Sequence, residues 1–125
     1  MLNGRVLFVD DEESLALLGG DLLEEFGFQV TCAFSGEGAL QLFKEDPDTF
    51  SVVVTDESMP GMSGIELAQE IYGCSPSTPV IICSGHMLSM QESGMEKTNI
   101  VGILAKTAVC TELPGMLQKI FTTTG

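Results

Sequence analysis

The chain of 125 residues is long enough for one domain with a sizeable core, and residues 1–125 are expected to form a single unit. Hydrophobic residues make up 44% of it and charged residues 18%, which is typical of a globular protein and not of a disordered one. A formal net charge of −13 disfavours direct binding to nucleic acid, because phosphate backbones would be repelled.

Short apolar segments predict the strands, at residues 5–9, 28–32, 51–55, 79–83 and 100–104. The first, third and fourth of them are continuously hydrophobic, as strands buried on both faces of a parallel sheet are. Between the segments, apolar residues recur with helical spacing. The sequence therefore predicts strands that alternate with helices.

The helix expected after the first strand has apolar residues at three- and four-residue steps, at Leu15, Leu18, Leu22 and Phe26. We expect this face to be buried and Gly27 to end the helix. Gly19 and Gly20 lie inside it, and each costs about 1 kcal/mol relative to alanine in a helix interior. Tertiary packing is expected to offset that cost.

Capping patterns predict the next two helices. Ser35 is placed to cap the second helix, which Pro47 ends. Ser63 and Glu66 have the three-residue spacing of a capping box, and an apolar face follows up to Gly73. Both helices are thus predicted to begin directly after a polar residue.

Two more helices are predicted, one near residues 89–97 and a last one that begins at Thr111. Repeated alternation of strand and helix favours a parallel sheet with helices on both faces and right-handed crossovers. In such sheets, polar groups that do chemistry gather at the carboxyl ends of the strands.

No segment approaches the roughly 18 apolar residues of a membrane span, and no signal-peptide pattern opens the sequence. The cysteines lack the C-x-x-C spacing of a zinc site, at Cys32, Cys74, Cys83 and Cys110. We interpret them as small core residues in a reducing compartment. The expectation is a cytoplasmic protein without membrane contact.

Polar residues follow the predicted strand ends, namely Asp10 and Asp11, Asp56, Ser84 and Lys106. If the first and third strands are neighbours, three aspartates converge, and their repulsion calls for a positive charge. A divalent cation and the Lys106 ammonium are the two candidates, and an all-oxygen site suits Mg²⁺. A metal, a lysine and a hydroxyl around a carboxylate favour phosphoryl transfer, with Asp56 as the nucleophile.

Four motifs stand in a fixed order: VLFVDDEE at 6–13, VVVTDESMPGMSG at 52–64, VIICSG at 80–85 and ILAK at 103–106. Together they resemble the receiver domain of bacterial two-component response regulators, including the receivers of hybrid sensor histidine kinases. The resemblance covers nearly the whole chain. It implies an α/β, flavodoxin-like, doubly wound sheet of five parallel strands in the order 2-1-3-4-5, with helices on both faces.

The resemblance also implies roles for the acidic residues. Asp56 corresponds to the phosphoacceptor of the family. Asp11 and Asp56 correspond to direct Mg²⁺ ligands, joined by the backbone carbonyl of Ser58, while Asp10 corresponds to the residue that holds the waters of the metal. The implied cofactor is therefore Mg²⁺.

For the remaining site residues, the resemblance implies contact with the phosphoryl group, through the hydroxyl of Ser84 and the ammonium of Lys106. The implied donor is a histidine kinase or a histidine phosphotransfer protein. Output would pass to a partner protein or to a fused domain outside this chain. Such a domain is not an enzyme acting on other molecules, since it catalyses only its own phosphorylation and dephosphorylation.

Two positions depart from the family pattern. Thr107 follows Lys106 where the family usually has proline, and a cis bond before a residue other than proline costs about 2.5 to 4 kcal/mol, so we expect a trans peptide. Ile103 stands where the family usually has a switch aromatic, which excludes aromatic rotation as the output mechanism. These departures leave an alternative open, a receiver-like docking module that is not phosphorylated.

Other classes with similar sheets fit less well. A flavin or nucleotide binder needs a phosphate-binding loop after the first strand, where the acidic DDEES stands. A phosphatase of the haloacid-dehalogenase type carries its nucleophile on the first strand in a D-x-D arrangement that is absent here.

Overall fold

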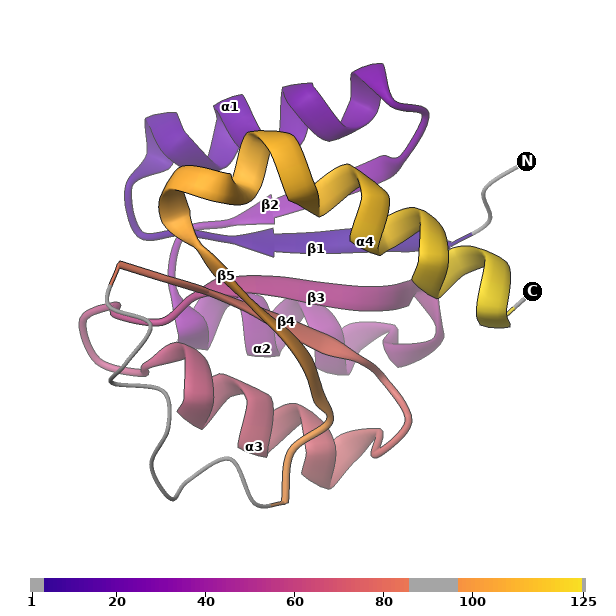
Figure 1. The fold of residues 1–125 in the computed structure, drawn as a ribbon. Coiled ribbons are helices and arrows are strands. Elements are labelled where there is room, and N and C mark those ends of the chain that lie inside the picture. Colours follow the sequence, from indigo (N-terminus) through magenta and orange to yellow (C-terminus); the bar gives the residue numbers. More distant parts are fainter. Residues whose placement is uncertain (1–3, 86–96, 125) are drawn as a thin grey trace.

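The computed structural model describes residues 4–85 and 97–124. Within these residues the chain forms a five-stranded parallel sheet in the order β2-β1-β3-β4-β5 (Figure 1). The strands are β1 (Arg5–Val9), β2 (Gln29–Ala33), β3 (Phe50–Asp56), β4 (Val80–Ser84) and β5 (Ile100–Ala105). The predicted strands and the implied strand order are both confirmed, with each strand end within one residue of its expected place.

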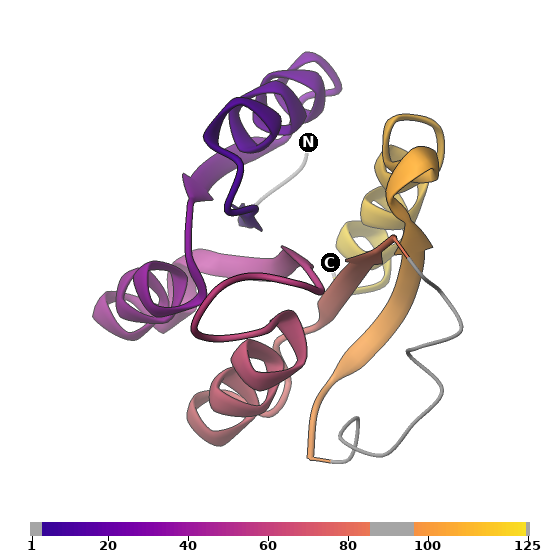
Figure 2. The same ribbon diagram turned by 90° about the vertical axis from the view of Figure 1, so that its left-hand side faces the viewer.

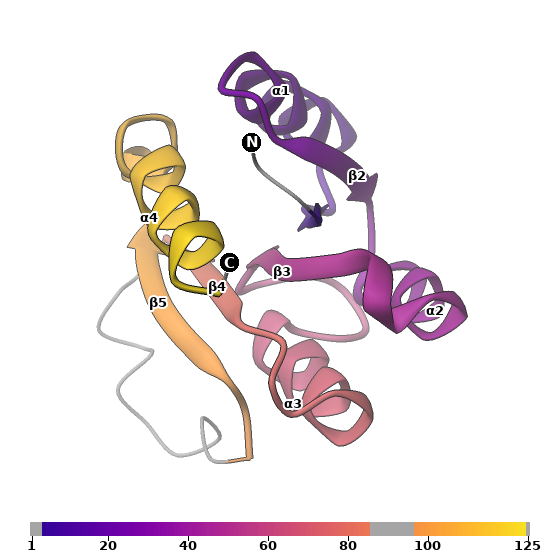
Figure 3. The ribbon, with the colours of Figure 1, turned by 90° about the vertical axis from the view of Figure 1, so that its right-hand side faces the viewer.

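Helices cover both faces of the sheet, as expected for a doubly wound fold. The helices α1 (Glu13–Glu25) and α4 (Val109–Thr124) lie on one face, and α2 (Gly36–Glu45) and α3 (Gly64–Cys74) on the other (Figures 1 and 3). Short 3₁₀ turns precede β3 (η1, Pro47–Thr49) and α4 (η3, Lys106–Ala108). Among the described helices, none combines the length and the apolar character that a membrane span requires.

The predicted helix ends are mostly confirmed. The Oγ of Ser35 accepts a hydrogen bond from the Gly38 N–H at 2.9 Å, and Ser63 and Glu66 form both bonds of a capping box. The last helix begins at Val109 and not at the predicted Thr111, because η3 leads directly into it. The helix predicted near residues 89–97 falls almost entirely on residues outside the described part of the chain.

Two hydrophobic cores sandwich the sheet, because successive residues of a strand point to opposite faces. Leu7 and Val53 pack with residues of α2 and α3 on one face. Val6 and Val54 pack with residues of α1 and α4 on the other. The central strands β1 and β3 are therefore buried on both sides, and they hold the residues at their carboxyl ends on a rigid platform.

The buried face of α1 differs from the predicted one. Its buried residues are Ala16, Gly20 and Leu23, whereas Leu15 is 41% exposed and Leu18 is 63% exposed. Phe26, also expected to be buried, is 48% exposed just after the helix. The prediction was wrong because it followed the spacing of the large apolar residues, whereas the buried face is formed by two small residues, Ala16 and Gly20, together with Leu23.

Close approach of α1 to the sheet explains both glycines of the helix. A Cβ atom on Gly19 would lie 2.6 Å from the ring of Phe8, and one on Gly20 would lie 2.9 Å from the Sγ of Cys32. Neither neighbour leaves room for a side chain. The close packing of the helix on the sheet thus offsets the unfavourable helix propensity of the two glycines, as the sequence analysis predicted.

The close approach predicts that Gly19→Ala destabilises the protein, although alanine is the better helix former. Overpacking against the buried Phe8 ring should lower the free energy of unfolding by about 1 to 3 kcal/mol. Gly73 is a matched control, since it lies in α3 and a Cβ there meets nothing within 4 Å. Gly73→Ala should raise stability by about 0.5 to 1 kcal/mol. Urea unfolding gives the free energy of unfolding of both variants. An equal increase in this free energy for both would contradict the prediction.

Candidate functional site

The carboxyl ends of the strands meet at one edge of the sheet, which faces the viewer in Figure 2. Asp10 follows β1, Asp56 and Ser84 are the last residues of β3 and β4, and Lys106 follows β5. Asp10, Asp11 and Asp56 each offer a carboxylate oxygen, and these oxygens lie within 4.8 Å of one another. The predicted convergence of three carboxylates is therefore present.

The backbone fixes the buried Asp10 at this edge. Its amide donates to the carbonyl of Ala33 at 3.2 Å, and its Oδ1 accepts from the Glu12 N–H at 2.9 Å. Burial raises the pKa of Asp10; the Glu12 N–H and the charge of Lys106 oppose this, and the charges of Asp56 and Asp11 add to it. The net increase shows that its negative charge is poorly compensated when no cation is bound.

Asp56 forms an ion pair with Lys106, which directly follows β5. Lys106 Nζ donates to Asp56 Oδ2 at 3.0 Å, and Asp56 is buried while Lys106 is partly exposed. Burial acts to lower the pKa of Lys106, but the hydrogen bond and charge of Asp56 outweigh it, with help from Asp10 and Glu12, and the pKa is raised. The lysine therefore stays charged.

The position of this lysine does not need the proline that usually follows it in the family. Residues 4–85 and 97–124 contain no cis peptide bond, so the bond between Lys106 and Thr107 is trans, as predicted. A 3₁₀ turn starts at Lys106 itself. This turn leads the chain away from β5 and into α4.

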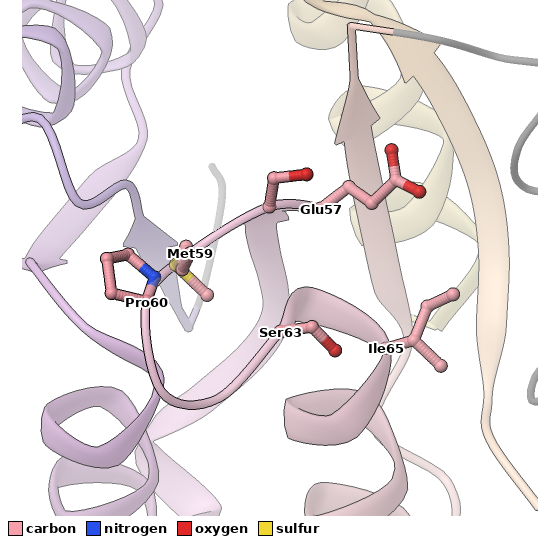
Figure 4. Close-up of a pocket in the computed structure, with 6 residues that line it drawn as sticks. Glu57, Met59, Pro60, Ser63 and Ile65 are labelled. Carbon is pink, nitrogen blue, oxygen red and sulfur yellow. The ribbon is translucent and has the colours of Figure 1, made fainter.

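The loop after Asp56 leaves the sheet sharply (Figure 4). The Glu57 N–H donates to the carbonyl of Cys83 at 2.9 Å, and the Gly64 N–H donates to the carbonyl of Glu57 at 2.9 Å. Gly61 has a φ of +81°, which glycine adopts easily. A side chain on Gly64 would collide with the backbone carbonyl of Asp56. Ser58 is exposed in this loop, and the metal-ligand role of its carbonyl stays a prediction.

Sequence reasoning missed Glu57, whose side chain holds the hydroxyl of Ser84. Ser84 Oγ donates to Glu57 Oε1 at 2.6 Å. Figure 4 shows the Glu57 side chain directed toward the carboxyl end of β4. Ser84 therefore lies at the predicted edge, but its hydroxyl donates to a carboxylate to which the sequence analysis gave no role, although Glu57 lies within the motif at 52–64.

An apolar hollow of about 190 Å³ opens beside the carboxylates, between α1 and α4. Its apolar lining includes Phe8, Leu18 and Val54, and Asp56 and Lys106 also line it. Apolar surroundings make a carboxylate charge harder to solvate. The hollow thus accounts for part of the unfavourable environment of the acidic cluster.

The cysteines only partly match their predicted role as core residues. Cys83 is buried and Cys32 is half-buried, with its Sγ donating to the carbonyl of Ala16 at 3.3 Å. Cys74 and Cys110 are exposed, so the prediction was wrong for these two. Cys74 is the last residue of α3, and Cys110 lies in the first turn of α4, where it lines the hollow beside Asp56 and Lys106.

These environments predict two fast-reacting thiols among the four. Burial raises the pKa of Cys83 to about 12, with smaller contributions from the charges of Asp56 and Asp10, so at pH 8 its thiolate is scarce as well as shielded. Cys74 and Cys110 should react with a disulfide reagent in the native protein, whereas Cys83 should react only after unfolding. Peptide mapping of the modified thiols checks this, and rapid native modification of Cys83 would contradict it.

Comparison with known proteins decides the family. The model of the response regulator receiver domain matches residues 6–118. The chain belongs to this family. Receiver domains in two curated proteins illustrate the relationship. The chain is 35% identical over 82 residues to the two-component response regulator ARR10 of Arabidopsis thaliana. This matched segment is 66% of this chain and 15% of ARR10.

The second relative is the virulence sensor protein BvgS of Bordetella pertussis, at 48% identity over 67 residues, or 54% of this chain and 5% of that protein. The receiver domain described here thus spans a small part of the curated relatives it matches. Among solved structures, the response regulator TrrA of Thermotoga maritima, in complex with Mg(2+)-BeF, has a TM-score of 0.84 at 27% identity, covering 94% of this chain and 98% of that one.

Proposed function

We propose that this receiver domain accepts a phosphoryl group on Asp56 in a Mg²⁺-dependent reaction and changes its surface for signalling. The observation that carries the proposal is the convergence of the carboxylates of Asp10, Asp11 and Asp56, with the Lys106 ammonium 3.0 Å from Asp56. A structural role alone does not explain three acids and one lysine at the ends of three strands. Without a ligand, the cluster opposes folding through charge repulsion.

The donor set fits Mg²⁺. It consists of oxygen atoms alone, and Mg²⁺ is usually held by one or two carboxylates while it keeps several waters. Asp11 and Asp56, with the Ser58 carbonyl, would hold the ion, and the buried Asp10 would hold its waters. The bound ion would neutralise negative charge on the transferring group. The complex of the related structure TrrA with Mg(2+)-BeF supports Mg²⁺ as the cation.

The residues of the chain suit transfer from a phosphorylated histidine. A carboxylate oxygen of Asp56 attacks the phosphorus, a P–O bond forms and the P–N bond of the donor breaks. The leaving imidazole nitrogen keeps the electron pair and takes up a proton. Lys106, already beside Asp56, then faces a phosphoryl oxygen, and the hydroxyl of Ser84 donates to another.

The proposal includes the setting of the domain. The donor is a histidine kinase or a histidine phosphotransfer protein, in keeping with the relationship to the sensor protein BvgS. Residues 1–125 act as one receiver domain in the cytoplasm, without direct contact to nucleic acid or membrane. The readout is an output partner or a fused domain, and the only catalysis is phosphorylation and dephosphorylation of the domain itself.

Beryllofluoride, an analogue of the phosphoryl group, distinguishes this function from docking without phosphorylation. With Mg²⁺ present, we expect beryllofluoride to bind and to shift the backbone amide resonances at the ends of β3, β4 and β5. The shifts should disappear without Mg²⁺. If beryllofluoride leaves the spectrum unchanged at millimolar Mg²⁺, the docking module is the better description.

A further inference from the structure

The contact between Glu57 and Ser84 occupies the hydroxyl that the phosphoryl group needs. The distance of 2.6 Å between Ser84 Oγ and Glu57 Oε1 lies in the range of charge-assisted O–H···O⁻ bonds. Ser84 is fully buried and Glu57 is half-buried, so the bond is partly shielded from water. The hydrogen bond between Ser84 and Glu57 is therefore stronger than one between two solvent-exposed side chains.

The hydroxyl of Ser84 carries a single proton, whereas an ionised carboxylate only accepts. Ser84 therefore cannot donate to Glu57 and to a phosphoryl oxygen on Asp56 at the same time. The two acceptors are also neighbours in the chain: Glu57 directly follows Asp56, the last residue of β3, and the Glu57 N–H donates to the carbonyl of Cys83. The backbone thus holds both acceptors in reach of the end of β4.

We propose that Glu57 is a positioning residue that holds Ser84 in the resting state and releases it when Asp56 is phosphorylated. This inference rests on the proposed function of Asp56. Breaking the bond between Glu57 and Ser84 opposes phosphorylation, because only the fraction of molecules with a free Ser84 hydroxyl can complete the phosphoryl site. The new negative charge on Asp56 repels the Glu57 carboxylate and favours the release.

The surroundings of Glu57 allow its side chain to leave. It lines an open hollow of about 520 Å³ together with Ser58, Met59, Pro60, Ser63 and Ile65. Figure 4 shows this space between the loop and the first turn of α3. This open space is where the Glu57 side chain can turn once it leaves Ser84.

A double-mutant cycle on beryllofluoride affinity at saturating Mg²⁺ tests the inference. The parent, Glu57→Ala, Ser84→Ala and the double variant are compared by calorimetry, with circular dichroism to confirm that each is folded. We expect Glu57→Ala to tighten binding about tenfold when Ser84 is present. In the Ser84→Ala background the same change should tighten binding less than about twofold, the part that comes from charge alone.

Glu57→Gln separates hydrogen bonding from charge, because its amide oxygen still accepts from Ser84 while the negative charge is gone. It should tighten binding less than Glu57→Ala does. Equal effects of Glu57→Ala in both backgrounds, or equal effects of alanine and glutamine, would overturn the inference and leave the proposed function intact. A parent protein that does not bind beryllofluoride would overturn the proposed function, and the inference with it.

Discussion

Replacing Asp56 by asparagine is expected to abolish phosphoryl uptake, with a loss of at least about 100-fold in rate. An amide is a poor nucleophile, and the variant also loses the negative charge that attracts Lys106 and Mg²⁺ at this position. The measurement is incorporation of phosphate from a labelled small-molecule donor such as acetyl phosphate.

Asp48→Asn is the matched control, because Asp48 is an exposed aspartate of η1, away from the carboxyl ends of the strands. Its rate of uptake should equal that of the parent. If the Asp56 variant were labelled as fast as the control, the acceptor would lie elsewhere in the chain.

Replacing Asp10 by asparagine should have opposite effects on metal binding and on stability. Mg²⁺ affinity is expected to fall about 10- to 100-fold, as it does when residues that support metal ligands are changed. The metal-free variant should be more stable than the parent at pH 7 by about 1 kcal/mol, because a buried and poorly compensated carboxylate has been removed. The asparagine side chain has the same length as that of aspartate and keeps an oxygen that can accept from the Glu12 N–H.

The stability difference should depend on pH. The pKa of Asp10 in the folded protein is raised above 3.8, so the folded state binds this proton more tightly than the unfolded state. Stability is then lost as the pH rises through the raised pKa, and it is regained on acidification toward that pKa. Urea unfolding without Mg²⁺ should show the advantage of Asp10→Asn shrink as the pH falls through the raised pKa of Asp10. Asp21→Asn, an exposed change on α1, should alter neither property, and a similar loss of Mg²⁺ affinity there would contradict the site.

The strands β1, β3 and β4 were predictable because each has one dominant physical signal. Strands buried on both faces appear as continuous apolar runs, and the polar residues directly after them mark the edge where they end. The caps at Ser35 and Ser63 were predictable for a similar reason, since the capping hydrogen bonds involve residues close in sequence. Such local signals need no knowledge of the rest of the fold.

The features that the sequence did not reveal depend on contacts between distant residues. The buried face of α1 is decided by the close approach of Gly19 to Phe8 and of Gly20 to Cys32, and no periodicity of large residues reports it. Glu57 follows an aspartate and precedes an exposed loop, so its pattern is that of a solvated residue. Its partner Ser84 is 27 positions away on another strand, and only the paired sheet brings the two together.

Peptide mapping of the phosphorylated protein tests the central claim most directly. The protein is treated with acetyl phosphate with and without Mg²⁺, the acyl phosphate is trapped by borohydride reduction, and the modified peptide is sequenced by mass spectrometry. We predict one modification, at Asp56, that requires Mg²⁺. A modification on a different residue, or one that forms equally well without Mg²⁺, would contradict the account.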